Sequence, residues 1–268
     1  MDVSQREIEA SLAICAADAG AVADAIAALR QIGGYVLVRP AELMLRDVYW
    51  DMPNDSLDCE RMALRLRTAG GGTLLTLKGP PTRDSDGLSS RLEIEAPWSA
   101  AALRQVLDTL DDAGVFASPA TVDTGKETPH AALEALGFVI VQERETRRRT
   151  RDLVPPETPD APALAELAID RTTYRFDGRA LVHNEIEIEV KAPGGERAIA
   201  QAMAALRKQY GPALRPWTYG KLATGETIRK RLKRGDLNGT VAPDGALLPA
   251  AYDRIEADFM AKNTMAAR

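Results

Sequence analysis

The sequence has few of the residues from which most metal and redox sites are built. Its 268 residues include two cysteines and two histidines. Cys15 and Cys59 lie far apart without a CxxC spacing, so we expect reduced thiols and neither a disulfide nor a thiolate metal site. His130 and His183 are too few for a histidine-ligated metal. Any metal is therefore expected to be a hard cation held by carboxylates.

The chain also lacks long apolar runs and an excess of positive charge. No run reaches the length of a membrane span and no basic segment opens the chain, so we expect a cytoplasmic protein without membrane contact. The net charge of −5 and the sequence pI near 5.3 argue against general nucleic-acid binding. They do not exclude a small polyanion bound in a local basic cavity.

What the chain has instead is a repeated acidic strand. A Glu-Ile-Glu run followed by a helix-like stretch occurs at Glu7–Glu9, Glu93–Glu95 and Glu185–Glu189. Because side chains alternate along a strand, each run puts carboxylates on one face and isoleucine on the other. The order of strands and helices suggests two pseudo-related halves. We predict an α+β fold in which a closed antiparallel β-barrel, or tunnel, has helices packed outside it.

Turn and helix signals add detail to this prediction. Ala69–Gly72 predicts a hairpin turn, and Asp177-Gly178 predicts another. Helices are expected near Thr227–Arg234 and Ala250–Ala261 in the tail.

Basic strands accompany the acidic ones. If their charged faces turn into one barrel, its interior carries both signs, which is costly unless the charges are paired or neutralised by a ligand. A phosphate chain with divalent cations neutralises the side chains of both signs. Arginine and lysine bind phosphate oxygens, and carboxylates bind Mg²⁺ or Mn²⁺. The basic residues concerned are Arg65, Arg67, Lys78, Arg91, Arg147, Arg149 and Arg151.

Each of these charge patterns, taken alone, also has an interpretation without a binding site. A single acidic or basic pair on a strand is usually a solvated sheet face, and Arg147–Arg151 alone would be a solvated edge that deters aggregation. An interior of salt bridges without a ligand is a further alternative, disfavoured because such networks gain little over apolar packing. Several strands of both signs in one chain favour a polyanion site.

A longer series of motifs runs in order along the chain. It comprises Glu7-Ile8-Glu9-Ala10-Ser11, Asp47-Val48-Tyr49-Trp50-Asp51, Arg65-Leu66-Arg67, Leu75-Thr76-Leu77-Lys78-Gly79, Arg91-Leu92-Glu93-Ile94-Glu95, Arg147–Arg151, Ile169-Asp170-Arg171, Glu185–Glu189 and Tyr219-Gly220-Lys221. Together these motifs resemble the CYTH superfamily, the triphosphate tunnel metalloenzymes, which includes thiamine-triphosphatases, tripolyphosphatases and class IV adenylate cyclases. The resemblance implies a tunnel domain over residues 1–225, followed by a C-terminal helical extension over residues 226–268.

The resemblance implies a divalent-metal-dependent hydrolase of a triphosphate (inorganic tripolyphosphate, thiamine triphosphate or a nucleoside triphosphate) bound in the barrel interior, with Mg²⁺ or Mn²⁺ as cofactor. The expected partner is this small polyanion, not nucleic acid or a membrane, and a homodimer stays open. The implied catalytic residues are Glu7, Glu9, Lys78 and Glu187. The implied metal ligands are Glu7, Glu9, Asp170, Glu185, Glu187 and Glu189. The implied substrate-binding residues are Arg65, Arg67, Lys78, Arg91, Arg147, Arg149 and Lys221.

One departure from the family pattern affects function. Where the family's ExExK strand has lysine, this chain has Ser11. In the family this lysine contacts the phosphate chain, so its loss removes a positive charge from the lining. Two alternatives to a triphosphatase therefore stay open: a class IV-type adenylate cyclase, and a polyphosphate- or nucleotide-binding module without turnover.

Overall fold

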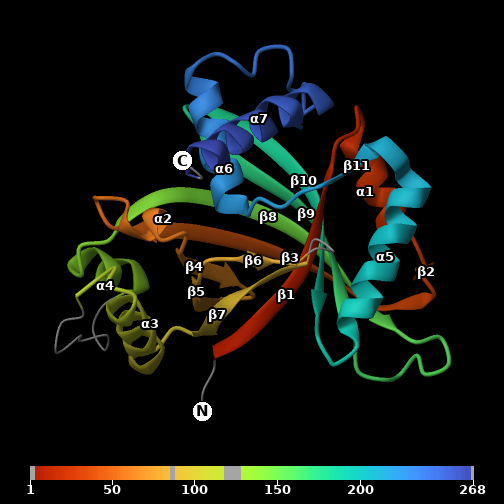
Figure 1. The fold of residues 1–268 in the computed structure, drawn as a ribbon, viewed down its shortest axis with the longest axis horizontal. Coiled ribbons are helices and arrows are strands. Elements are labelled where there is room, and N and C mark those ends of the chain that lie inside the picture. Colours follow the sequence, from red (N-terminus) through yellow and green to blue (C-terminus); the bar gives the residue numbers. More distant parts are fainter. Residues whose placement is uncertain (1–3, 85–87, 118–127, 267–268) are drawn as a thin grey trace. The chain divides into compact units, whose positions relative to one another are not determined.

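The computed structural model describes residues 4–84, 88–117 and 128–266, and its elements are labelled in Figure 1. The chain forms two compact units. The first contains the described parts of Met1–Glu7, Met44–Asp84 and Ser89–Arg144, and the second contains those of Ile8–Leu43, Ser85–Leu88 and Glu145–Arg268. Three long strands contribute residues to both units: β1 (Ser4–Ile14), β3 (Tyr35–Asp51) and β8 (Val139–Val154).

The strand order confirms the predicted α+β class and the closed antiparallel sheet. The strands follow one another as β11-β1-β10-β9-β8-β3-β4-β5-β7-β6, and β1 also pairs with β7. The path from β1 through β10, β9, β8, β3, β4, β5 and β7 therefore returns to β1. Among the described helices, none is long and apolar enough to cross a membrane.

In the first unit, one face of the sheet packs on helices. The remaining strands are β4 (Ala63–Ala69), β5 (Gly72–Lys78), β6 (Thr82–Arg83) and β7 (Ser89–Pro97), and the helices are α2 (Ser56–Cys59), α3 (Ala100–Asp112) and α4 (Pro129–Ala135). Leu64 and Leu66 of β4 belong to an apolar core that includes Leu107 of α3. Arg65 and Arg67 alternate with these leucines, so they share the opposite face of the strand. The predicted hairpin joins β4 to β5.

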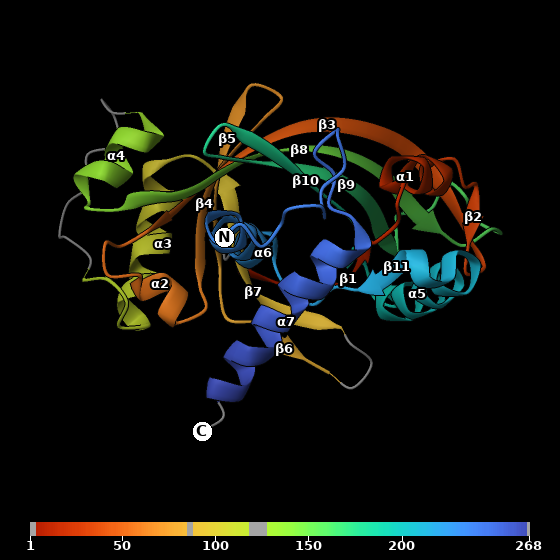
Figure 2. The same ribbon diagram turned by 90° about the horizontal axis from the view of Figure 1, so that it is seen from above.

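The second unit is built the same way around β10 (Arg179–Val190). This strand lies between β9 (Ala165–Phe176) and β1, while β11 (Leu214–Pro216) pairs with β1 and β2 (Gln31–Ile32) with β3. Figures 1 and 2 show helices α1 (Ala19–Ala27) and α5 (Gly195–Tyr210) side by side, and the short helix η1 (Gly211–Ala213) follows α5. Ile186 and Ile188 pack in their apolar core. The alternating glutamates therefore lie on the opposite face.

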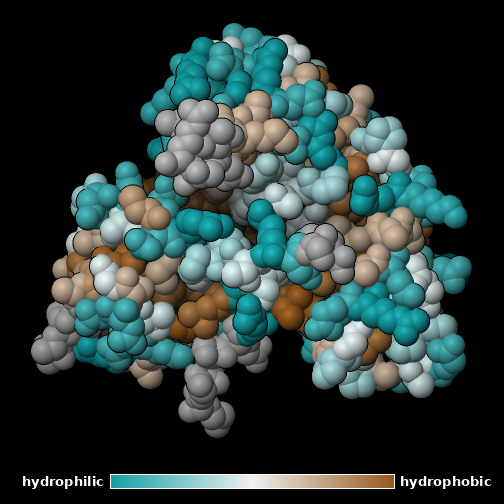
Figure 3. All heavy atoms as spheres, viewed as in Figure 1, coloured by the Kyte–Doolittle hydropathy of each residue, from teal (hydrophilic) through white to brown (hydrophobic). Residues whose placement is uncertain are grey.

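Solvent-facing and turn positions in the second unit follow the sequence pattern. The surface over α5 is mostly hydrophilic (Figure 3), as expected for a helix that buries one stripe of side chains. The predicted turn at Asp177-Gly178 is confirmed: Phe176 pairs with Arg179, and the two turn residues have φ angles of 50° and 77°. Positive φ at both central positions is the requirement of a type I′ two-residue hairpin turn.

The C-terminal residues are part of the second unit. Helix α6 (Lys221–Lys233) begins six residues before the helix expected near Thr227–Arg234. This start has no capping signal in the sequence, because the N-cap residue is Gly220, which has no side chain to accept a hydrogen bond. The predicted boundary at residue 225 falls inside α6. Helix α7 (Pro249–Ala266) shares an apolar cluster with α6, β1 and β10. The division into a tunnel domain and an extension stays a prediction.

Candidate functional site

Asp47 is the centre of a buried charged cluster in the first unit. Its carboxylate accepts hydrogen bonds from Arg67 at 2.7 and 2.9 Å and from Arg144 at 3.0 Å, and Arg65 lies 3.8 Å away. The side chain of Asp47 is 1% exposed. Burial by itself would raise its pKa, but the three guanidinium groups outweigh burial and hold the pKa well below the usual range.

Arg144 is a member of this cluster that the sequence did not single out. Besides Asp47 it donates to the hydroxyl of Tyr49, and its guanidinium carbon lies 4.5 Å from the centroid of the Tyr49 ring. The third arginine, Arg65, also donates to Glu95 at 3.0 Å. Arg144 is buried between the more exposed Glu143 and Glu145 of β8, a difference that the structure shows and the charge pattern of the strand does not.

A second group in the first unit surrounds Glu7. Its two carboxylate oxygens accept from Lys78 and Arg91, each at 2.6 Å, and Lys78 also lies 3.0 Å from Glu93. Burial would raise the pKa of Glu7, but the two cations outweigh it and lower the pKa to about 2. The structure thus brings Glu7 together with two of the predicted phosphate-binding residues.

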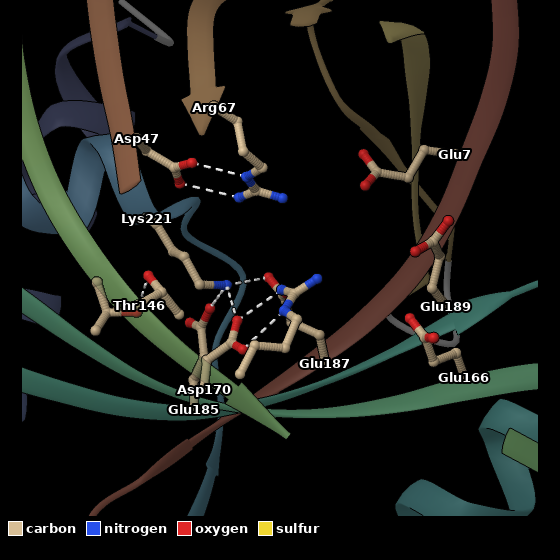
Figure 4. A network of polar contacts seen from close by, with 12 residues as sticks. Glu7, Asp47, Arg67, Thr146, Glu166, Asp170, Glu185, Glu187, Glu189 and Lys221 are labelled. Carbon is tan, nitrogen blue, oxygen red and sulfur yellow. Dashed lines mark hydrogen bonds and ion pairs between the residues drawn. The ribbon is translucent and has the colours of Figure 1, made fainter. Parts of the chain in front are cut away.

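The second unit contains a compact group of three carboxylates. Asp170 of β9 and Glu185 of β10 are direct cross-strand partners, and Glu187 follows two residues later on the same face. One oxygen of each carboxylate lies within 4.8 Å of the others, and Figure 4 shows the three side chains converging. Asp170 and Glu185 are each 1% exposed. We call Asp170, Glu185 and Glu187 the acidic cluster.

Two cations contact the acidic cluster. Lys221, the first residue of α6, lies 3.0 Å from Asp170 and contacts Glu185 and Glu187. Arg148 donates twice to Asp170, at 2.8 and 2.6 Å, and once to Glu187 at 2.5 Å. Burial would lower the pKa of Lys221, but the three carboxylates outweigh burial and raise it. Burial likewise opposes ionisation of Asp170, yet Arg148 and Lys221 lower its pKa.

The acidic cluster fits a divalent cation. Carboxylate oxygens are the ligands that Mg²⁺ and Mn²⁺ prefer. Three carboxylates against Arg148 and Lys221 leave one net negative charge, so a cation has an electrostatic reason to bind. A convergent set of oxygens also supplies several ligands at once, which a single exposed carboxylate does not.

Three further glutamates form a row beside the acidic cluster. Glu9 of β1 pairs with Glu189 of β10, which pairs with Glu166 of β9, and Lys191 lies 2.8 Å from Glu189 and 3.9 Å from Glu166. The next row toward the acidic cluster places Ser11 opposite Glu187. The position where the family motif has lysine therefore faces a carboxylate that Lys221 and Arg148 already contact.

The structure does not bring Arg147 and Arg149 together with the acidic cluster. Arg147 pairs with Glu42 at 2.8 Å, with both side chains more than half exposed, and Arg149 pairs with Asp24 at 2.7 Å. Arg148, one residue away, points to the other face of β8 and contacts Asp170. The sequence could not choose between the faces, because β8 carries arginine at both strand parities.

In this chain an antiparallel sheet closes on itself and carries buried charges of both signs. The CYTH domain model matches residues 21–213, and the chain belongs to this family. Members of the family are mostly metal-dependent triphosphatases that bind triphosphate substrates. No curated protein sequence matches the chain significantly.

Two solved structures are similar to the chain. HpAC1 from Hippeastrum, described as a candidate adenylyl cyclase that reveals a dominant triphosphatase activity, is similar with a TM-score of 0.52 and 18% identity, covering 83% of this chain and 96% of its own. A candidate adenylate cyclase from Bacillus halodurans has a TM-score of 0.47 and 16% identity, covering 82% and 97% of the two chains. At such identities the likeness to HpAC1 establishes the fold alone.

Proposed function

We propose that this protein is a divalent-metal-dependent triphosphatase that hydrolyses inorganic tripolyphosphate, thiamine triphosphate or a nucleoside triphosphate. The observation that carries the proposal is the acidic cluster with Arg148 and Lys221 in contact with it. Carboxylates for a metal and cations for phosphate oxygens lie within one hydrogen-bonded group. Membership of the CYTH family supports the same reaction class.

In this proposal, Asp170, Glu185 and Glu187 hold Mg²⁺ or Mn²⁺, and Glu9 and Glu189 of the second unit are further ligands. Glu7, the remaining proposed metal ligand, belongs to the first unit. A metal held by these residues would supply charge neutralisation at the phosphate oxygens and a more acidic water for the attack. The protein's own contribution is to position and neutralise the substrate, because phosphoryl transfer depends mainly on these two effects. The family resemblance implies catalytic roles for Glu7, Glu9, Lys78 and Glu187. We keep these roles as part of the proposal.

Arg148 and Lys221 are the proposed phosphate-binding cations of the second unit. Both now neutralise the acidic cluster, and a divalent cation there would release part of their charge to a phosphate chain. Arg148 can bind two oxygens at once through its planar guanidinium group, whereas Lys221 acts as a point charge. In the first unit the proposed phosphate-binding residues are Arg65, Arg67, Lys78 and Arg91. We assign Arg148 the role expected of Arg147 or Arg149, because those two pair with the exposed carboxylates of Glu42 and Asp24 and not with the acidic cluster.

Two other functions differ from this proposal in their products. A class IV-type adenylate cyclase would convert ATP to pyrophosphate and cyclic AMP, and the description of HpAC1 favours testing it. A binding module without turnover would retain affinity for the triphosphate, and Ser11 favours testing that. In the module, Ser11→Lys would restore hydrolysis.

The test is a product assay with a matched pair of variants. The protein is given tripolyphosphate, thiamine triphosphate and ATP with Mg²⁺ or Mn²⁺, and phosphate, pyrophosphate and cyclic AMP are measured. We expect phosphate release, and a decrease of at least about tenfold in Glu187→Gln, which removes one charge from the acidic cluster. Glu145→Gln makes the same change on β8, where Glu145 pairs with Arg175, and should leave the rate unchanged.

Other products would decide against the proposal. Pyrophosphate with cyclic AMP would identify a cyclase, and tight binding without any product would identify the binding module. Phosphate release that Glu187→Gln and Glu145→Gln affect equally would show that the acidic cluster is not the site of hydrolysis.

A further inference from the structure

A buried histidine connects the acidic cluster to the C-terminal helix. His183 of β10 is 0% exposed and lies two residues before Glu185. Its Nε2 atom is 2.8 Å from Oε2 of Glu185, and its Nδ1 atom is 3.1 Å from the hydroxyl of Tyr252 on α7. Tyr252 is also 0% exposed. Neither His183 nor Tyr252 has a role in the function proposed above.

We propose that Tyr252 and His183 are positioning residues that fix Glu185 for cation binding, so that helix α7 sets the metal affinity of the acidic cluster. The inference rests on the metal site of the proposed function. It extends that function by giving the C-terminal residues a part in the site, through hydrogen bonds and not through contact with the metal or the substrate.

The hydrogen bonds define a direction for this relay. The carboxylate of Glu185 can only accept, so Nε2 of His183 carries the imidazole proton and donates to it. Nδ1 of the neutral imidazole then accepts from the phenol O–H of Tyr252. Burial raises the pKa of Tyr252 well above its ordinary value, so the phenol keeps the proton that it donates.

Glu185 needs such a partner because its neighbours repel it. Asp170 and Glu187 carry the same charge, and one oxygen of Glu185 faces Lys221 among them. With Oε2 held by His183, the carboxylate has one orientation, and Oε1 stays directed at the cluster. Hydrogen bonds of this kind to ligating carboxylates orient them and tune metal affinity.

The aromatic rings around the relay hold it in place. Trp217 lies against His183 at 5.7 Å between ring centroids and against Tyr252 at 5.4 Å, edge to face. Tyr252 and Trp217 both belong to the apolar cluster through which α7 packs within the second unit. The relay is therefore fixed by packing as well as by hydrogen bonds, which is the condition for precise ligand placement.

The test measures binding of Mn²⁺ alone to the full chain, through the electron paramagnetic resonance signal of the free ion at one fixed pH. Tyr252→Phe removes the hydroxyl and keeps the ring. Ile255→Val is the matched control, because Ile255 lies three residues further along α7 in the same apolar cluster and makes no polar side-chain contact. His183→Leu removes the donor to Glu185, whereas His183→Gln keeps an N–H group at a similar distance from the backbone.

We expect Tyr252→Phe and His183→Leu to raise the dissociation constant for Mn²⁺ by about tenfold or more. His183→Gln should recover most of the affinity, and Ile255→Val should change it less than twofold. Affinity unchanged in Tyr252→Phe and His183→Leu, or lowered equally by Ile255→Val, would overturn the inference while leaving the metal site intact. A wild-type chain that binds no Mn²⁺ would instead overturn the metal site itself, and the inference with it.

Discussion

Replacing Arg148 or its neighbour Arg149 with alanine tests which face of β8 belongs to the site. Arg148 makes contacts of 2.5–2.8 Å to Asp170 and Glu187, and its side chain is 16% exposed. The side chain of Arg149 is 27% exposed and pairs with Asp24, whose side chain is 75% exposed. The two substitutions remove the same side chain from adjacent positions of one strand. Any difference in stability between the two variants therefore comes from the contacts that each arginine makes.

The expected losses in the free energy of unfolding differ several-fold between the two variants. Removing one partner of a buried ion pair costs about 3–5 kcal/mol, and we expect the lower end for Arg148→Ala because Lys221 still contacts both carboxylates. Arg149→Ala should cost less than about 1 kcal/mol, as solvent-exposed pairs do. Urea unfolding of the metal-free protein, followed by circular dichroism, measures the difference in the free energy of unfolding.

The stability loss in Arg148→Ala should also depend on pH. Because Arg148 and Lys221 hold the pKa of Asp170 below its ordinary value, the stabilisation from Asp170 is present above that ordinary value and is lost as the pH falls. The cost of Arg148→Ala should therefore shrink in acid. Equal losses in the two variants at neutral pH, or a loss below about 1 kcal/mol for Arg148→Ala, would refute the placement of Arg148.

Two further predictions concern Glu7 and the cysteines. Glu7→Gln should lower the free energy of unfolding at neutral pH by up to about 3 kcal/mol. Because the pKa of Glu7 falls from 4.5 to about 2, this difference should vanish between those pH values, and a pH-independent difference in urea titrations would contradict the assignment. Burial raises the pKa of Cys15 to about 12, so a thiol reagent should label one thiol per native chain, the exposed Cys59, and two in denaturant. Rapid labelling of both thiols in the native chain would show that Cys15 is accessible.

Local sequence pattern determined which residues of a single strand share a face. Strand periodicity of two requires only the order of residues, so the separation of Arg65 and Arg67 from the leucines of β4 was predictable. The glutamates and isoleucines of β10 separated in the same way. The hairpin turns were predictable because glycine and aspartate tolerate positive φ at positions that other residues avoid.

Tertiary structure decided which of several equivalent residues enters the site. Arginine lies on both faces of β8, so the sequence of this strand does not tell which face enters the site. Only the ion pairs with Asp170 and Glu187 identify Arg148. Lys221 was predicted through a family motif, but its contacts with three carboxylates depend on where α6 begins. The relay from Tyr252 through His183 joins residues 69 positions apart. No local pattern encodes such a contact, because it forms only when packing of the apolar cluster places α7 against β10.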